Sequence, residues 1–445
     1  MSTVAPARSA AYRTIRRVFE AGAYADRALE SEVAGLDGRD RALATRLVFG
    51  TVQRRATLDH VIDAFSSRPA ERLDPAVLAA LRLGLYGLLF LERTPAHAVV
   101  SDSVSLVKEQ NRGGAGLVNA VLRRATREGA AVVGALEDRS PAGAAIRHSV
   151  PVWLAELWWA ELGPDPARAL LETLNAPAEA ALRVNTLRAD LAAVRGRLPV
   201  AARTVPDLPE ALVLEAPFDV HGSVLHAEGA IMAQSRASML VGRIVDPRPG
   251  ERILDLCAAP GGKTTHLAAL AGDRASILAI ERHPGRAAAL DRTCRRMGAS
   301  SVEVQVADAA DLVLEDRFDR VLVDPPCSGL GTLRSRPDLR WRTSPERVRE
   351  LAGLGARILD AAAPLVAPGG QLVFSVCTVS RTEGPDQIAG FLTRHPEFTA
   401  DDLAAAHPEV GDSAARPHLQ LRPDLDGTDG FFIARLRREH RRAAG

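Results

Sequence analysis

The chain has 445 residues, 47% of them apolar, and a formal net charge of only +1. This length predicts about three domains, and the apolar content is ample for packed cores. A net charge near zero excludes a strong positive field over the whole molecule, so any surface for a polyanion must be a local patch. The four cysteines form no Cys-x-x-Cys pair, which argues against a zinc site or a disulfide framework. We expect no metal.

The sequence gives no sign of a membrane protein. Its N-terminus lacks the uninterrupted apolar core of a signal peptide, and the apolar run from Gly84 to Leu91 is far too short to span a bilayer. We therefore expect a soluble, cytoplasmic monomer.

Residues 1–130 show the apolar spacing of helices. Ile15 and Val18 recur at helical intervals. The stretch from Pro75 to Leu91 is apolar on nearly every side except at Arg82, which suits the central helix of a bundle. An all-helical first domain is predicted.

Five arginines would give this helical region a basic face. They are Arg13, Arg16, Arg17, Arg54 and Arg55. A nucleic-acid surface and an ordinary solvated arginine surface are equally compatible with this pattern.

A linker and a small mixed domain are expected next. Residues 131–146 are rich in alanine and glycine and contain Ser140-Pro141, which is typical of a linker. In residues 147–232, short strands are predicted at Ala181–Asn185 and Ala211–Leu214. We interpret this segment as a small α/β module.

The most informative stretch runs from Ile253 to Ala268. An apolar run leads into Pro260-Gly261-Gly262 and then into a helix, which is typical of a cofactor site at the edge of a parallel sheet. A nucleotide-hydrolase loop is one alternative, because Gly262-Lys263-Thr264 resembles its end. That loop requires a glycine where Cys257 stands, and Pro260 removes a phosphate-binding N–H group. The better match is a site for S-adenosylmethionine.

Strands and helices alternate through residues 233–445. Apolar strands are expected at Ile277–Ile280, Val302–Val306, Arg320–Val323, Gln371–Phe374 and Asp429–Arg435. Such alternation predicts a mostly parallel sheet covered by helices on both faces.

Five chemically capable residues fall at or just beyond these strand ends: Asp255, Glu281, Asp308, Asp324 and Cys377. Ligands of open α/β sheets bind at that edge. Glu281 follows the glycine turn at about the twenty-residue spacing of a ribose-binding carboxylate. Asp308 is placed to accept from an adenine amino group. The alternative for both carboxylates is helix N-capping.

Three segments carry a specific resemblance: Asp255-Leu-Cys-Ala-Ala-Pro-Gly-Gly-Lys-Thr264, Asp324-Pro-Pro-Cys-Ser-Gly329 and Ser375-Val-Cys-Thr378. They resemble the motifs of RNA (cytosine-5)-methyltransferases. The bacterial branch that modifies 16S ribosomal RNA has a NusB-like domain in front. The run from Thr94-Pro-Ala-His-Ala98 through Val118-Asn-Ala-Val-Leu122 resembles the second half of that domain.

The resemblance implies a multidomain fold. It comprises an all-α NusB-like RNA-binding domain over 1–130, a small α/β RNA-binding module over 147–232, and a Rossmann-like methyltransferase domain over 233–445. The last would have a mostly parallel seven-stranded sheet closed by an antiparallel strand.

The resemblance also implies the site residues. Those expected to bind S-adenosylmethionine are Cys257, Ala258, Ala259, Pro260, Gly261, Gly262, Lys263, Glu281, Asp308 and Asp324. Cys377 would attack C6 of the cytosine, Cys327 would help remove the C5 proton, and Asp324 would hydrogen-bond the base. Cys294 is expected to be a buried structural residue. Val376 stands where the family commonly has threonine.

The partner implied is small-subunit ribosomal RNA, presenting a flipped or single-stranded cytosine. Four arginines interleave with Trp341 in the segment Gly331–Arg342, which suits phosphate contacts and stacking. Three alternatives remain. These are another RNA such as tRNA, an amino-group methyltransferase, which commonly has an aromatic residue at the place of Cys327, and a non-catalytic RNA-binding assembly factor.

Overall fold

The computed structural model describes residues 4–92, 94–411 and 416–440, so the extreme ends of the expected ranges 1–130 and 233–445 lie outside it. The chain divides into two compact units. The helical unit contains residues 1–176 and 336–343, and the sheet unit contains residues 177–335 and 344–445.

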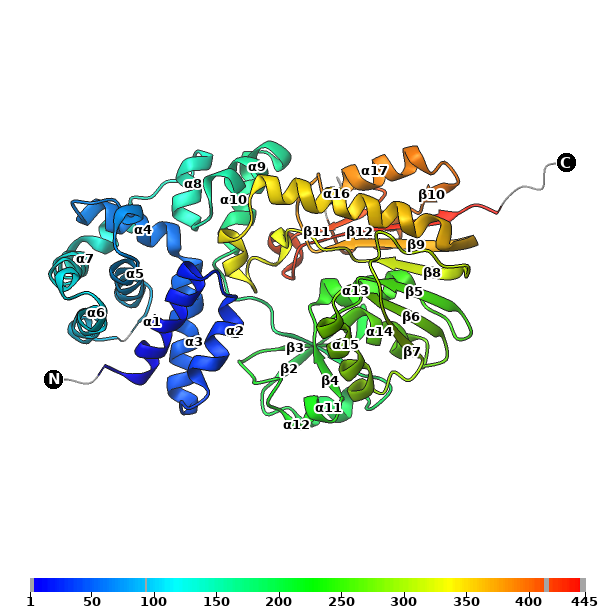
Figure 1. Ribbon diagram of the computed structural model, residues 1–445, viewed down its shortest axis with the longest axis horizontal. Helices are drawn as coiled ribbons and strands as arrows, with labels where there is room; N and C mark the ends of the chain where they lie inside the picture. Colours follow the sequence, from blue (N-terminus) through cyan, green and yellow to red (C-terminus); the bar gives the residue numbers. More distant parts are fainter. Residues whose placement is uncertain (1–3, 93, 412–415, 441–445) are drawn as a thin grey trace. The chain divides into compact units, whose positions relative to one another are not determined.

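The helical unit is built around one buried helix. Helix α5 packs against α1, α3, α4, α6 and α7 (Figure 1), and its only charged side chain, Arg82, bonds Asp59 at 2.7 Å. The predicted central helix is confirmed. The elements of this unit are α1 Pro6–Glu20, α2 Ala25–Val33, α3 Gly38–Gln53, α4 Arg55–Phe65, η1 Ala70–Arg72, α5 Pro75–Leu89, α6 Ala96–Gln110, η2 Arg112–Gly114, α7 Ala115–Gly134, α8 Pro141–His148, α9 Val152–Leu162, α10 Pro164–Thr173 and η4 Pro337–Trp341.

Most of the expected linker over 131–146 is helical. Helix α7 continues to Gly134, and α8 begins at Pro141. The physical reason is the alanine content, because alanine has the highest helix propensity. Ser140 then caps α8 by accepting a hydrogen bond from the Gly143 N–H at 3.2 Å, with proline at the first helical position.

The expected RNA-contact role is contradicted for Arg340. Arg340 and Trp341 belong to the segment Arg336–Thr343, which packs within the helical unit. Arg340 is fully buried and donates to the carbonyl oxygens of Gln53, Ser149 and Leu174 at 2.6–3.1 Å. These carbonyls lie at the C-terminal ends of α3, α8 and α10, where helices leave acceptors unpaired and favour a cation.

The predicted basic face is largely neutralised. Three of its arginines bond within the unit: Arg13 to Glu32 at 2.6 Å, Arg16 to Glu20 at 2.6 Å and Arg17 to Ser31 at 2.6 Å. The other two lie over aromatic rings, Arg54 on Phe90 and Arg55 on Phe19 and Trp341. Periodicity places these arginines on helices, but it does not reveal their partners on neighbouring helices.

A small antiparallel sheet opens the sheet unit. Its strands are β1 Ala181–Val184, β2 Ala202–Val205, β3 Leu208–Leu214 and β4 Ile231–Ala233, in the order β2-β3-β1-β4, with α11 Leu191–Arg197 and α12 Val224–Ala227 between them. The two strands predicted from sequence are confirmed as β1 and β3.

The main sheet is mostly parallel, as predicted. Its strands lie in the order β10-β12-β9-β8-β5-β6-β7, and β11 pairs with β12. The pairs from β9 through β7 are parallel, and β12 is antiparallel to β9. Among the described residues the sheet has eight strands rather than seven, because two three-residue strands, β10 and β11, pair with β12.

The elements of this larger part are α13 Arg236–Val245, β5 Arg252–Leu256, α14 Gly262–Leu270, β6 Ser276–Glu281, α15 Pro284–Met297, β7 Val302–Val306, β8 Phe318–Val323, η3 Leu330–Thr332, α16 Pro345–Ala362, η5 Ala363–Leu365, β9 Val366–Val376, α17 Pro385–Arg394, β10 Phe398–Ala400, α18 Leu403–Ala406, β11 Leu419–Leu421, α19 Pro423–Asp426 and β12 Phe431–Arg438.

Helices cover both faces of this sheet (Figure 1). Side chains of β5 alternate between the two cores: Ile253 packs with α13–α15, and Leu254 packs with α16 and α17. Because both faces are buried, polar side chains gather at the two ends of the strands. No helix in the described part of the chain is long and apolar enough to cross a membrane.

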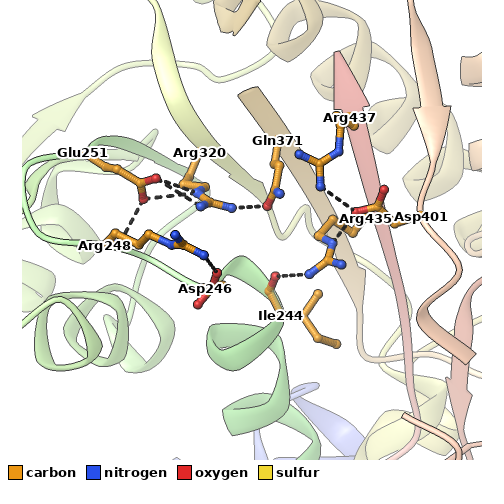
Figure 2. Close-up of polar contacts among 9 residues, drawn as sticks. All are labelled: Ile244, Asp246, Arg248, Glu251, Arg320, Gln371, Asp401, Arg435 and Arg437. Carbon is orange, nitrogen blue, oxygen red and sulfur yellow. Dashed lines mark hydrogen bonds and ion pairs between the residues drawn. The ribbon is translucent and has the colours of Figure 1, made fainter. Parts of the chain in front are cut away.

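The ends at which the parallel strands begin are held by ion pairs (Figure 2). Arg320, at the start of β8, bonds Glu251 at 3.0 Å and also bonds Gln371 of β9. In β12, Arg435 bonds Asp401 at 2.7 Å and donates to the Ile244 carbonyl at 3.4 Å. This end of the sheet is occupied by structural contacts, so the opposite edge is the one available for a site.

Candidate functional site

The site begins where β5 turns into α14. Cys257 has a φ of +65° and Gly261 a φ of +99°. A Cβ on Gly261 would also approach Leu290 to 2.7 Å, so only glycine fits there. Asp255 ties strand to helix, because its Oδ2 accepts from the Thr264 hydroxyl at 2.6 Å. Burial raises the pKa of Asp255 to about 7.

Some backbone N–H groups of this turn donate within the protein, whereas the backbone at Gly262 is uncrowded. The N–H of Ala258 donates to the Ile280 carbonyl, and that of Gly261 donates to the Ala258 carbonyl, both at 2.9 Å. A Cβ on Gly262 would meet only Met232 and Gln234, at 3.8 and 3.9 Å. A ligand could therefore approach the backbone closely at Gly262.

Glu281 ends β6 and is 3% exposed. Its Oε1 accepts from the His283 N–H at 2.9 Å, and its Oε2 lies 3.4 Å from the Arg286 guanidinium. Arg286 also donates to the Ala259 carbonyl at 2.9 Å. Because His283 is the N-cap residue of α15, Glu281 is not that helix's cap.

Asp308 lies two residues beyond β7, and its side chain is 36% exposed. Its Oδ1 accepts from the Ala310 N–H at 3.1 Å, and its Oδ2 pairs with Arg282 at 3.4 Å. A turn follows it, so the helix-capping alternative does not hold for Asp308 either.

Two thiols meet at the ends of β8 and β9. The Sγ atoms of Cys327 and Cys377 are 3.4 Å apart, and both residues are half-buried. Asp324 lies beside them, with its Oδ2 accepting from Lys263 Nζ at 2.7 Å and its Oδ1 from the Ser375 hydroxyl at 3.0 Å. The structure thus brings both predicted cysteines and the predicted aspartate together next to the turn.

The two thiols influence each other. The hydrogen bond with Cys377, together with burial, raises the pKa of Cys327 well above its usual value, so Cys327 carries a proton at neutral pH. Burial disfavours the Lys263 charge, but the ion pair with Asp324 outweighs it and raises the lysine pKa. A cation therefore stands beside the thiol pair.

The other two cysteines lie apart from this chemistry. Cys294 is 4% exposed within the apolar core, as expected of a structural residue, and burial raises its pKa to about 12. Burial likewise raises the pKa of Cys257. A thiol held protonated in this way is a poor nucleophile. Among the described residues, no group of three His, Cys, Asp or Glu side chains could hold a metal ion.

Comparison with known proteins decides the family. Ribosomal RNA small subunit methyltransferase B of Thermus thermophilus is 37% identical over 406 residues, covering 91% of this chain and 90% of the relative. The same-named protein of Pseudomonas putida is 33% identical and covers 96% of this chain and 98% of the relative. This chain belongs to the ribosomal RNA small subunit methyltransferase B family.

Family models and a solved structure agree with this assignment. The 16S rRNA methyltransferase RsmB/F family matches residues 243–437, the NusB family matches residues 5–127, and a ferredoxin-like domain of the RsmF/B-like methyltransferases matches residues 150–221. The crystal structure of PH0851 superposes with a TM-score of 0.83 at 26% identity, covering 98% of this chain and 99% of PH0851. The predicted family and fold class are confirmed.

The sequence analysis missed two residues at the end of β1 that bond to the methyltransferase domain or its approach, of which Arg183 reaches the turn itself. Arg183 of β1, fully buried, donates to the Gly262 carbonyl and the Thr265 hydroxyl, both at 2.7 Å. Asn185 donates to the carbonyls of Gly229 and Met297 at 2.9 and 2.7 Å. Their unusual signal was an arginine within an apolar strand and an asparagine directly after it.

A third missed residue is Glu383, which is 2% exposed and lies in the loop before α17. It accepts hydrogen bonds from Ser328 and Thr378, each of which directly follows a cysteine of the pair. Nothing in the local pattern distinguishes Glu383 from a solvated glutamate ahead of a helix.

Proposed function

We propose that this chain methylates C5 of a cytosine in small-subunit (16S) ribosomal RNA, using S-adenosylmethionine and a covalent bond between Cys377 and C6 of the base. The observation that carries the proposal is the 3.4 Å separation of the Cys327 and Cys377 sulfurs beside Asp324. Two adjacent thiols suit a reaction that needs one nucleophile and one proton acceptor.

The residues of the turn fit S-adenosylmethionine, which would supply an electrophilic methyl group. The open backbone at Gly262 and the N-terminus of α14 offer N–H groups to a carboxylate. Glu281 offers acceptors to ribose hydroxyls, and half-exposed Asp308 offers one to an adenine amino group. The cofactor set would be Cys257, Ala258, Ala259, Pro260, Gly261, Gly262, Lys263, Glu281, Asp308 and Asp324.

Cys377 begins the reaction. C5 of cytosine is a poor nucleophile until a group adds to C6. The Cys377 thiolate forms the sulfur–C6 bond, and the electron pair of the C5–C6 double bond becomes available at C5. Asp324 accepts hydrogen bonds from the base edge and favours a proton on N3. Either sulfur could donate the 3.4 Å contact between the thiols, and in this step Cys327 is assigned as the donor that supports Cys377 as the thiolate.

Cys327 ends the reaction. Once the Cys377 sulfur is bonded to C6 it is a neutral thioether, and the main cause of the raised Cys327 pKa is removed. Cys327 can then ionise and take the proton from methylated C5. The electrons of that C–H bond restore the C5–C6 double bond and expel Cys377 as thiolate, which returns the enzyme to its starting state.

The test uses the full-length protein with unmodified 16S ribosomal RNA and tRNA transcripts. Cys327→Ala should attack and methylate but stall before elimination, leaving a protein–RNA adduct that survives denaturing gels and contains 5-methylcytosine. Cys377→Ala should give neither adduct nor product. An adduct from Cys377→Ala and none from Cys327→Ala would reverse the two roles. Methylation of tRNA but not of 16S RNA would refute 16S ribosomal RNA as the substrate.

A further inference from the structure

The loops that carry the two thiols are fastened to each other at one buried side chain. Cys327 follows β8 and Cys377 follows β9, and neighbouring strands of a sheet lie about 4.8 Å apart. Strand pairing alone does not fix the separation of side chains on the loops beyond. The observed 3.4 Å between the sulfurs therefore needs a cause within the loops.

Glu383 supplies such a cause. Its Oε1 accepts from the Ser328 N–H at 2.7 Å, and its Oε2 accepts from the Thr378 hydroxyl at 2.9 Å and from the Ser328 hydroxyl. The two hydroxyls are themselves 3.2 Å apart. One carboxylate thus holds the residue after each cysteine, and its two oxygens can serve both loops at once.

The contacts are well shielded. Ser328, Thr378 and Glu383 are 4%, 0% and 2% exposed. Hydrogen bonds to a buried carboxylate are short and strong, and a buried carboxylate that loses its donors is costly. A second tie supports the same geometry, because the Gly331 N–H donates to the Cys377 carbonyl at 3.0 Å.

We propose that Glu383 is a positioning residue that holds the Cys327 and Cys377 loops together and so sets the distance between the two sulfurs. It lies outside the cofactor turn, and its hydrogen bonds given above go to Ser328 and Thr378 rather than to the cysteines. The expected effect of Glu383 on catalysis rests on the proposed function, whereas its effect on the distance between the thiols does not. The spacing of the thiols is a property of the protein itself and can be measured without RNA.

The direct readout is phenylarsine oxide, which bonds two neighbouring thiols at once and releases water. The wild-type protein should bind one equivalent tightly, and Cys377→Ser should lose that binding. Glu383→Ala should weaken it at least tenfold, and Glu383→Gln, which keeps one acceptor oxygen, should lose less. Thr378→Val removes one donor at nearly constant shape and should also weaken it.

The catalytic readout follows from the same displacement. A reacting group misplaced by about 1 Å can cost about 10²-fold in rate. Single-turnover methylation by Glu383→Ala should therefore fall by roughly that factor, while S-adenosylmethionine affinity by calorimetry stays unchanged. Glu251→Gln, at the opposite end of the sheet, is the matched control and should change neither arsenical binding nor the methylation rate.

The outcomes separate the two claims. Wild-type arsenical affinity in both Glu383→Ala and Thr378→Val would overturn the positioning role, and Thr378→Val decides alone if Glu383→Ala does not fold. Weakened arsenical binding in Glu383→Ala, in a protein whose wild type does not methylate 16S RNA and whose Cys327→Ala variant forms no RNA adduct, would keep the positioning role and refute the proposed function.

Discussion

Both ends of the main sheet carry charged and polar side chains, but these side chains have different roles at the two ends. At the end where the parallel strands begin, Arg320 bonds Glu251 in a two-pronged pair and also reaches Gln371 (Figure 2). At the other end, Asp324 and Lys263 form a pair at 2.7 Å, but two half-buried thiols stand beside it.

The difference teaches that ion pairing by itself does not identify a site. Arg320 is 8% exposed, and its partners complete its bonding within the fold. The Asp324 side chain is 27% exposed and keeps acceptor capacity for a further donor. Substitutions at the two ends should therefore separate stability from activity.

The largest effect is expected at the thiol end. Cys377→Ser replaces a nucleophilic thiolate by a hydroxyl, and methylation should fall by at least about 10³-fold. Its free energy of unfolding should change by less than about 0.5 kcal/mol, because the residue is half-buried and close in size. Single-turnover methylation and urea unfolding measure the two quantities.

The matched control is Cys294→Ala, which removes a sulfur from the apolar core. It should lose about 1 kcal/mol of stability and keep its activity. If Cys294→Ala lost activity instead, burial would not separate the structural from the reactive cysteines.

The second largest effect is expected at the end of the sheet where the parallel strands begin, and it is a loss of stability. Arg320→Met leaves the Glu251 carboxylate without its ion-pair partner, and the free energy of unfolding should fall by about 2 kcal/mol. This is less than the roughly 3–5 kcal/mol of a fully buried pair, because the Glu251 side chain is 21% exposed. Activity per folded molecule should stay within about twofold.

Arg317 is exposed, so Arg317→Met is the control for Arg320→Met. It should change neither the free energy of unfolding nor the activity per folded molecule. A large loss of activity in folded Arg320→Met would show that the two ends of the sheet are coupled, which would break the comparison.

The sequence predicts where strands end better than it predicts which groups a side chain will hydrogen-bond. Strand ends follow from apolar runs, and the rule that ligands bind beyond them placed Asp324 and Cys377 at one edge. Arg340 shows the limit. It belongs to an arginine-rich loop typical of RNA contacts, but it saturates the C-terminal carbonyls of three helices far away in the sequence. Only the packed fold reveals such acceptors.

Glu383 and Arg183 illustrate the same limit within the site. Each holds groups from segments distant in sequence, and neither Glu383 nor Arg183 belongs to a motif segment itself. The residues recognised by motif touch one another across loops. The residues that position them could be found only from burial and hydrogen bonding.

The third prediction concerns two carboxylates at the end of the sheet that carries the candidate site. Glu281→Ala and Asp308→Ala should each weaken S-adenosylmethionine binding by about 1–3 kcal/mol, as expected for lost hydrogen bonds to charged acceptors. Glu281→Ala should also lose stability, because Glu281 bonds the His283 N–H and Arg286 inside the fold. Calorimetry on the full-length protein gives the affinities. Unchanged affinity in both variants would leave these carboxylates with structural roles only.

The smallest effect concerns Asp255, whose pKa burial raises to about 7, against an ordinary value of about 3.9 in an unfolded chain. Between these values the native state keeps a proton that the unfolded state has lost. Stability should therefore fall as pH rises from about 4 to about 7, by at most about 1.4 kcal/mol per pH unit, and then level off.

Asp255→Asn should remove that contribution, since an amide does not titrate and its carbonyl can still accept from the Thr264 hydroxyl. Thermal unfolding from pH 5 to 8 should show the variant gaining stability relative to wild type up to about pH 7, with no further gain above it. Asp207→Asn, at an exposed turn, should run parallel to wild type throughout. Parallel curves for Asp255→Asn as well would mean that this buried carboxyl ionises as it does in water, and that the turn beneath the cofactor site carries a charge rather than a proton.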